Sequence, residues 1–478
     1  MNQSHRYKRI LFFSLIMISG VSCKRSFLDV DPQGKKQDEQ FFVSSKDAVE
    51  AVNSIYGHLN IWEECGFPLL AITSIPSDDA DKGSSPGDAG FLDDFDNFTF
   101  TSTQFLIDDF WKGQYTGINL SNQCIENIPK IAMDGSLQNR LIAEAKFLRA
   151  YHYFNLVRAY GGEPKVDKAP VTVEELNPSR ASKEEIYALI EKDLNDAAIL
   201  PVSYSGKDIG RATKGATLAL LAKVKMYQKN WSAVLSLTNQ VIPSYTLMDD
   251  YEKIFRDESN SESIFEVQTK QDINCSIGDN YTNIQSVRGQ WGWGFNTPSQ
   301  NLADSYEAGD ERKEGTILFK GETTPEGDLV FSSAPNPMYN QKAYQPTSIP
   351  KICGSDPKDQ NRRVLRLGDV LLMNAEAANE LDQNVQALEA LNKVRNRAKL
   401  ASVNIIDKDL LRQAIWKERR AELAMEEDRF FDLVRQGRAG QVLKALGKQF
   451  VDGKNELFPI PQTQIDLSGG KLIQNPGY

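Results

Sequence analysis

Residues 418–437 read ERRAELAMEEDRFFDLVRQG, a stretch in which charged and apolar residues recur at helical spacing. The charged residues within reach of one another are Glu418, Glu422, Glu426, Arg419 and Arg429. On an exposed helix such pairs contribute only a few tenths of a kcal/mol each. Here apolar residues such as Leu423 and Phe430 lie on nearly every side. The pattern therefore favours a partly buried ion network that fixes helix register, with a helix end at Gly437.

The sequence before this stretch predicts pairs of helices. Apolar residues repeat at helical spacing over 367–378 and again over 388–398, with a polar turn at 382–384 between them. A second pair covers 216–241 and ends at Pro243. Units of roughly thirty-odd residues with this form are typical of tetratricopeptide repeats. We therefore expect a mainly α-helical protein, in which about four tetratricopeptide-like helix pairs form a superhelical scaffold with minor β structure.

Two loop-rich insertions are expected in a single domain over residues 44–478. The first, about 62–100, loses helical periodicity and is rich in Pro, Gly and Asp. The second, about 245–363, contains the alternating run SIFEVQ, which predicts a strand, and Thr297 before Pro298, which predicts a helix start. Insertions on a repeat scaffold gather on one face, which is often the binding face.

Helix starts can be predicted elsewhere from capping boxes. Ser44 with Asp47, and Ser182 with Glu185, have the spacing in which a hydroxyl and a carboxylate satisfy the first amide groups of a helix.

The first residues of the chain predict an export signal. Basic residues end at Arg9, and an apolar run from Ile10 to Val21 follows. This run is too short to span a bilayer comfortably. Cys23 comes directly after small residues and resembles the acylated cysteine of a bacterial lipoprotein, although an ordinary cleaved signal with an incidental cysteine is the alternative. We expect a signal peptide at 1–22, lipid attachment at Cys23, and a tether over 23–43.

Composition excludes one class of ligand. The 478 residues include 65 acidic and 55 basic ones, which gives a formal net charge of −10. Nucleic acids and heparin-like polyanions are held by clustered Lys and Arg, so we expect neither as a ligand.

Few residues suggest catalysis or metal binding. There is no HExxH, Walker or dinucleotide signature, and His58 and His152 lie far apart in the sequence. We therefore expect no enzyme and no cofactor. Acidic residues cluster between Asp78 and Asp94 and could bind Ca²⁺, but they lack EF-hand spacing, which favours a solvated acidic loop. The cysteines outside the signal region have no metal-ligand spacing, and their pairing stays open: Cys65, Cys124, Cys275 and Cys353.

The candidate ligand-binding residues are aromatic. Of six tryptophans, Trp62, Trp291 and Trp293 lie in or beside the predicted loops, and the others are explained by helix packing. A sugar ring packs its C–H face on a flat aromatic ring, while nearby polar groups bind its hydroxyls. The candidate companions are Tyr281, Asn283, Arg288 and Tyr344. The alternative, that a tryptophan packs the insertion onto the scaffold, is left open for each.

Several stretches together resemble the SusD/RagB family of outer-membrane nutrient-binding lipoproteins. Besides 418–437 they are FLDVDP at 27–32, AEAKFLRAYHYFNLVRAYGG at 143–162, GWGFN at 292–296 and the chain end LFPIPQTQIDLSGGKLIQNPGY at 457–478. The sequence departs from the family pattern at Glu427, where the family usually has Gly. The turn there is expected to be shaped differently.

The resemblance implies a function. The protein would be a surface-exposed lipoprotein of the outer membrane that captures an oligosaccharide and delivers it to a SusC-like TonB-dependent transporter, without bond chemistry. The transporter would pack on the repeat face. A peptide-capturing RagB-like protein is the alternative. A pure assembly scaffold and an exported glycosidase are two further classes that experiments have to exclude.

Overall fold

The computed structural model describes residues 42–478 apart from 170–171, 173–174, 176–177, 271–279 and 351–358. The predicted signal peptide, Cys23 and nearly all of the predicted tether lie outside the described residues, as do Cys275 and Cys353. Among the helices that the structure describes, none combines the length and apolar character needed to cross a membrane.

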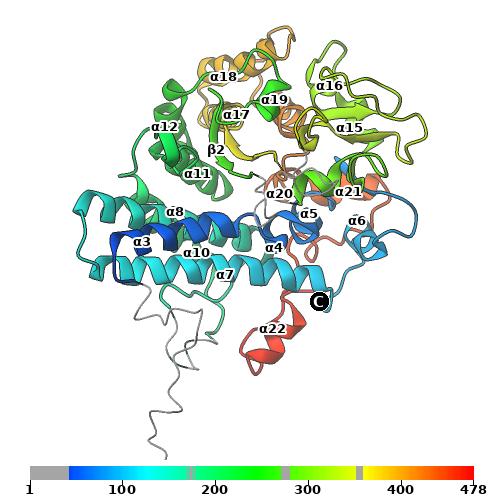
Figure 1. Cartoon of the computed structure of the whole chain (residues 1–478). Coiled ribbons are helices and arrows are strands. Elements are labelled where there is room, and N and C mark those ends of the chain that lie inside the picture. Colours follow the sequence, from blue (N-terminus) through cyan, green and yellow to red (C-terminus); the bar gives the residue numbers. More distant parts are fainter. Residues whose placement is uncertain (1–41, 170–171, 173–174, 176–177, 271–279, 351–358) are drawn as a thin grey trace, which may run out of the picture.

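The N-terminal half forms a layer of long helices that lie side by side, coloured blue to cyan in Figure 1. They are α3 (Ser45–His58), α7 (Phe105–Asn127), α8 (Gly135–Tyr160) and α10 (Lys183–Ala197). Ser44 and Ser182 open α3 and α10 with complete capping boxes, as predicted. Helix α8 contacts both α7 and α10, and its apolar residues are buried on almost every side.

A second group of helices forms the upper half of Figure 1. They are α11 (Lys214–Tyr227), α12 (Trp231–Val241), α17 (Leu367–Glu380), α18 (Asn384–Arg397) and α19 (Lys408–Leu423). Helices α11 and α12 pair with each other, as do α17 and α18, and α17 also packs against α12 and α19. Both predicted helix pairs are therefore confirmed, and the mainly α-helical fold with them.

The stretch 418–437 is divided between two helices. Helix α19 ends at Leu423 and α20 (Arg429–Arg435) follows after a turn in which Met425 and Glu427 have φ of 64° and 70°. This is the left-handed region, which glycine occupies without cost. The Glu427 carboxylate accepts a hydrogen bond from Arg362 at 2.7 Å, an ion pair that a glycine could not make. Two short helices follow towards the C-terminus: α21 (Ala439–Ala445) and α22 (Gln462–Leu467).

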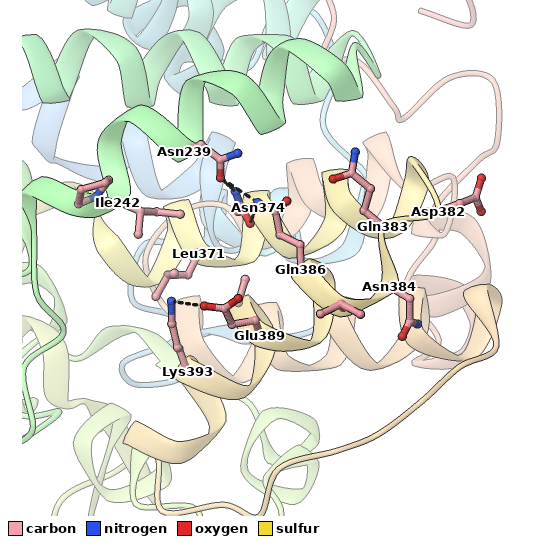
Figure 2. Close-up of a pocket in the computed structure, with 13 residues that line it drawn as sticks. Asn239, Ile242, Leu371, Asn374, Asp382, Gln383, Asn384, Gln386, Glu389 and Lys393 are labelled. Atoms are coloured by element: carbon pink, nitrogen blue, oxygen red, sulfur yellow. Dashed lines mark hydrogen bonds and ion pairs between the residues drawn. The ribbon is translucent and has the colours of Figure 1, made fainter.

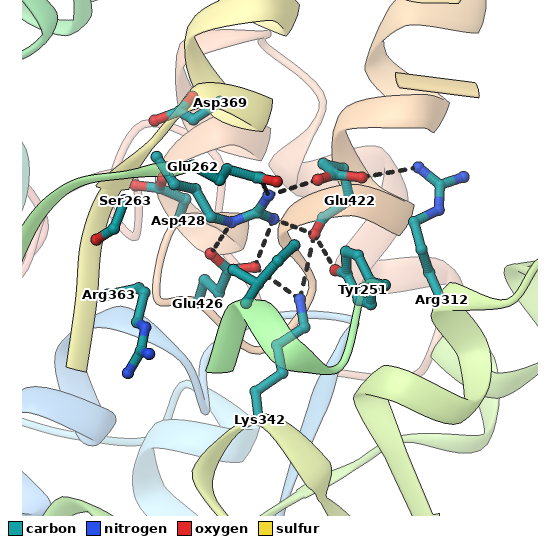
Figure 3. A network of polar contacts seen from close by, with 12 residues as sticks. Tyr251, Glu262, Ser263, Arg312, Lys342, Arg363, Asp369, Glu422, Glu426 and Asp428 are labelled. Carbon is teal, nitrogen blue, oxygen red and sulfur yellow. Dashed lines mark hydrogen bonds and ion pairs between the residues drawn. The ribbon is translucent and has the colours of Figure 1, made fainter. Parts of the chain in front are cut away.

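The predicted ion network is present (Figure 3). It was predicted to be partly buried, and its central residues are fully buried. At its centre Glu422, which is 0% exposed, binds Arg366, Arg312 and Arg397. Burial by itself raises the pKa of Glu422, but the three guanidinium groups hold that pKa well below its usual value. These pairs join α19 to strand β6 (Arg362–Arg366), to α18 and to the second insertion.

Strands are few and short, and all of them pair antiparallel in twos. The pairs are β1 (Ala80–Gly83) with β3 (Phe295–Pro298), β2 (Ser263–Val267) with β6 (Arg362–Arg366), and β4 (Ile317–Phe319) with β5 (Met338–Asn340). The strand predicted from SIFEVQ is confirmed as β2. Short helices of the insertions include α6 (Asp93–Asn97), α13 (Lys253–Arg256), α14 (Tyr281–Gln285) and α16 (Arg312–Thr316).

Two local predictions are wrong. The start of the first insertion is not a surface loop, because α4 (Trp62–Cys65) and α5 (Phe67–Thr73) occupy it and every residue of α5 is buried. Apolar residues in FPLLAIT are too evenly distributed to show an amphipathic period, which is the pattern of a fully buried helix. Thr297 does not open a helix either, because it lies in β3. Helix α15 (Gln300–Ser305) begins later, and the Ser299 hydroxyl caps it.

Candidate ligand-binding site

The structure buries four of the seven predicted ligand-binding residues. Trp291 is 8% exposed and Tyr344 1% exposed, with their rings 5.0 Å apart inside the second insertion. Tyr281 and Asn283, both on α14, are buried as well. These side chains are packed against other groups of the protein, and their role in ligand binding stays a prediction. For Trp291 the packing alternative holds, because its ring fills a small core with Val287 and Tyr339.

Trp62 and Trp293 meet at the surface. Trp62 is the first residue of α4, and Trp293 stands just before β3. Both side chains are half-buried, and their ring centroids are 6.3 Å apart. Phe67 lies beneath them, 5.3 Å from the Trp62 ring and 6.0 Å from the Trp293 ring. Phe67 in turn packs edge-on against Phe295 at 4.9 Å, so the two tryptophans rest on a rigid aromatic base.

Two further phenylalanines extend this surface, and sequence reasoning missed them. The Phe91 ring is 5.9 Å from Phe67, and the Phe105 ring is 5.0 Å from Phe91. Phe105 is 49% exposed although it is the first residue of α7. We call the four half-buried or exposed rings, those of Trp62, Trp293, Phe91 and Phe105, the aromatic surface. Large rings that gather in this way with part of their surface exposed are typical of an interaction site.

Arg288 supplies a charged group beside Trp293. Its guanidinium binds Asp88 at 2.7 Å, and both side chains are about one-third exposed. The Ser84 hydroxyl lies within donating distance of two acceptors, the Asp88 carboxylate and the backbone oxygen of Trp293, at 2.8 Å from each. The hydrogen bond from Ser84 is the largest cause that lowers the pKa of Asp88, and Arg288 adds to it. Charged and hydroxyl groups therefore border the aromatic surface on its Trp293 side.

The two-stranded ribbon β1–β3 brings these segments together. Gly83 pairs with Phe295, and a Cβ at Gly83 would lie 2.5 Å from the backbone oxygen of Gly294. Both glycines have positive φ, 75° each. The close approach of the two backbones at this point requires glycine on both strands, and it fixes the position of Trp293.

The acidic cluster is not simply a solvated loop. Asp78 and Asp79 are buried just before β1. Asp78 accepts two hydrogen bonds from Arg429 at 2.6 and 2.8 Å, and Asp79 accepts one from Arg420 at 2.6 Å. The interpretation as a solvated loop is therefore wrong for these two residues. Within the described ranges no group of three or more His, Cys, Asp or Glu side chains is arranged to hold a metal ion. The calcium alternative stays a prediction.

In the part of the chain that the structure describes, the histidines and cysteines that could do acid–base or nucleophilic chemistry lie in the interior. His58 and His152 meet in the interior, 5.8 Å between ring centroids, on either side of Glu64. Cys65 and Cys124 are buried, and burial raises the pKa of the Cys124 thiol to about 12. Residues 83–87 read GSSPG, the spacing of a nucleophile elbow, but no helix opens directly after them as that motif requires.

A groove of about 710 Å³ lies between the helix pairs (Figure 2). Several of its polar side chains bind one another: Asn374 donates to Asn239 at 2.9 Å, Gln386 to Asn239 at 2.8 Å, and Lys393 pairs with Glu389 at 3.0 Å. Because these groups already have partners, a small polar ligand would gain little from them.

Comparisons with known proteins identify the family. The profile of the SusD family matches residues 335–478, and a second profile, described as starch-binding and associating with the outer membrane, matches residues 26–226. Each covers stretches in which the resemblance was found. The chain belongs to the SusD-like family.

Relatives align with the SusD-like chain over nearly its whole length. SusD-like protein P2 of Formosa agariphila is 26% identical, over 99% of this chain and 100% of its own length. A solved laminarin-binding SusD-like protein is 29% identical with a TM-score of 0.79, covering 91% of this chain and 100% of its own. Surface glycan-binding protein A from Bacteroides fluxus is 26% identical with a TM-score of 0.77, covering 91% and 100%. Like these relatives, the protein is mainly α-helical.

Proposed function

We propose that this protein binds an oligosaccharide on its aromatic surface. The observation that carries the proposal is the pair of half-buried tryptophans, Trp62 and Trp293, held 6.3 Å apart by segments from two different insertions. Two tilted rings over a packed aromatic base suit the C–H faces of successive sugar units, and Arg288 and Asp88 are close enough to bind hydroxyl groups. The laminarin-binding and glycan-binding relatives support this class of ligand.

The proposal includes delivery across the outer membrane. The family description places relatives at the outer membrane, and a lipid on Cys23 would hold the protein at the cell surface. We infer that it passes its ligand to a SusC-like TonB-dependent transporter and releases it without bond chemistry. The groove in Figure 2, with Val385 82% exposed at its rim, is the surface that we assign to the transporter.

Titration calorimetry on the chain from Lys24 onward, with a panel of neutral oligosaccharides, tests ligand binding. Trp62→Ala and Trp293→Ala should each weaken binding about tenfold, which corresponds to about 1.4 kcal/mol. Trp231→Ala is the matched control, because Trp231 is also half-buried but opens α12, outside the aromatic surface. If peptides bind and no glycan does, the peptide-capturing alternative replaces this proposal. Turnover of a chromogenic sugar would identify a glycosidase instead.

Copurification with a SusC-like transporter from the same cells tests the proposed delivery step. Val385→Asp should reduce the amount of transporter that copurifies, because a charge would be buried at the contact. Leu410→Asp on α19 is the control, since Leu410 is also exposed but does not line the groove. Equal recovery with both variants would remove the groove from the proposal and leave glycan binding untouched.

A further inference from the structure

A second cavity, of about 780 Å³, is rich in positive charge. It lies between α19, α21 and α15, and four cationic side chains line it together with one tryptophan and neutral polar groups. The lining side chains that matter are Arg420, Arg429, Arg438, Lys417, Trp416, Gln413, Gln441 and Ser305.

Three of the four cations already have carboxylate partners. Arg429 and Arg420 bind Asp78 and Asp79, as described above. Lys417 lies 3.1 Å from Glu307, a carboxylate that also serves Arg395. These pairs leave the Arg429 and Arg420 side of the cavity close to neutral.

Arg438 is different. Within the described part of the chain no carboxylate lies within ion-pair distance of it. Its guanidinium donates a weak hydrogen bond to Gln436 at 3.3 Å and lies over the Trp416 ring, 5.4 Å from the centroid. Burial lowers the pKa of Arg438, and the charges of Arg429 and Arg420 lower it further, against a smaller opposing effect of Asp78. A bound anion would offset this unfavourable charge.

We propose that this cavity binds one carboxylate or sulfate group of an acidic oligosaccharide, with Arg438 as the principal partner. The planar guanidinium presents paired N–H donors that match an oxyanion. The inference rests on the proposed function, because it assumes a glycan ligand. A single oxyanion is consistent with an acidic protein, since binding a polyanion would need many clustered cations.

The other lining groups favour a sugar over a peptide. The indole N–H of Trp416 donates to Glu376 at 3.0 Å, which holds the ring beside Arg438. This ring gives a sugar an apolar contact next to the oxyanion. Gln413, Gln441 and Ser305 are neutral side chains that can donate to and accept from hydroxyl groups.

The cavity is separate from the aromatic surface but joined to it rigidly. Asp79, which binds Arg420, directly precedes β1, and Ser84 at the other end of β1 holds Trp293. The ribbon β1–β3 therefore has the aromatic surface at one end and a wall of the cavity at the other. Variants in the two places can be tested independently, because they share no side chain.

Titration calorimetry on the chain from Lys24 onward tests the inference with five probes: an oligosaccharide with one uronic acid unit, an oligosaccharide with one sulfate group, a neutral oligosaccharide of equal length, inorganic sulfate and an acidic peptide. Arg438→Gln should weaken binding of at least one acidic oligosaccharide about tenfold and leave the neutral one unchanged. Binding of the acidic sugar should also weaken between about 50 and about 200 mM NaCl, because salt screens the pair. The acidic probe whose affinity falls in Arg438→Gln shows whether the site prefers a carboxylated or a sulfated sugar.

Two variants keep the test independent of folding. Lys444→Gln is the matched control, because Lys444 lies on α21, the helix that Arg438 directly precedes, and pairs with the exposed Asp452. Arg438→Lys keeps the positive charge but loses the paired N–H donors of the guanidinium. Its affinity for the acidic sugar should lie between those of wild type and Arg438→Gln. Unfolding midpoints of all variants show whether the fold is intact.

The outcomes separate the inference from the proposed function. If neutral and acidic sugars bind equally and Arg438→Gln changes neither, the inference is wrong and the proposed function stands. Binding of inorganic sulfate alone, or of acidic peptides in preference to acidic sugars, would also overturn it. If no glycan of any charge binds, the proposed function fails and the inference with it.

Discussion

Glu422→Gln should destabilise the protein strongly while changing almost no volume. Glu422 is 0% exposed and is the shared acceptor for three arginines. Removing one partner of a buried ion pair costs about 3–5 kcal/mol, because the other charge is left without compensation. Here each arginine keeps another carboxylate. These remaining pairs are Arg366–Glu262, Arg397–Glu262 and Arg312–Asp310, at 2.8, 3.0 and 2.8 Å.

We therefore expect a loss at the low end, about 3 kcal/mol in the free energy of unfolding. The pH dependence has a definite sign. Because the pKa of Glu422 is held below its usual value, its contribution is complete above the unfolded value of about 4.3 and is lost as the pH falls through the folded pKa. The difference between wild type and variant should shrink on acidification below that point.

Urea unfolding followed by tryptophan fluorescence measures the effect. Glu50→Gln is the control, because Glu50 is half-exposed and pairs only with the exposed Lys46. That change should stay within about 0.5 kcal/mol. A Glu422→Gln value equally small would refute the view that the buried network stabilises this packing.

The remaining predictions concern backbone strain, pH and packing. Glu427→Gly should relieve left-handed strain yet cost about 2 kcal/mol net, because Arg362, 4% exposed, loses its carboxylate; urea unfolding measures it. Stability should fall as the pH drops below about 6.5, because burial and then His152 lower the pKa of His58; thermal unfolding between pH 8 and pH 5 measures it. Gly117→Ala should cost about 1–3 kcal/mol, because its Cβ would lie 2.2 Å from the His152 ring; thermal unfolding measures this too.

Each of these predictions has a result that contradicts it. A Glu427→Gly protein more stable than wild type would show that strain outweighs the ion pair. His58→Gln should flatten the pH profile, and an unchanged slope would assign the titration to another group. Gly135→Ala is the control for Gly117→Ala, because nothing lies within 4 Å of its Cβ.

The repeat scaffold could be predicted because short stretches of sequence are enough to indicate each of its helices. Apolar period and capping residues define the pairs α11–α12 and α17–α18 and the start of α3. The burial of α5 could not be predicted in this way, because a helix buried on all sides has no period to show.

The candidate site was harder to predict because it depends on long-range contacts. Trp291 and Trp293 are the same residue type in the same short segment, yet one is core and the other is surface. The glycines between and after them let the chain turn, with φ of 75° at Gly294, so neither helical nor strand period applies. Asp78 and Asp79 look solvated in the sequence because their arginine partners lie 351 and 341 residues away. Nothing local marks Phe91 or Phe105 as neighbours.

The pairs of Asp78 with Arg429 and of Asp79 with Arg420 constrain attempts to redesign sugar preference. Transplanting residues 62–100 from another SusD-like protein would exchange the anchoring acids together with the recognition rings. A donor segment without matching acids would leave the guanidinium groups of Arg429 and Arg420 without their carboxylate partners. Diversification of ligand choice should therefore be easiest beyond β1, around Phe91 and Phe105, where side chains can be swapped without disturbing the C-terminal signature helices.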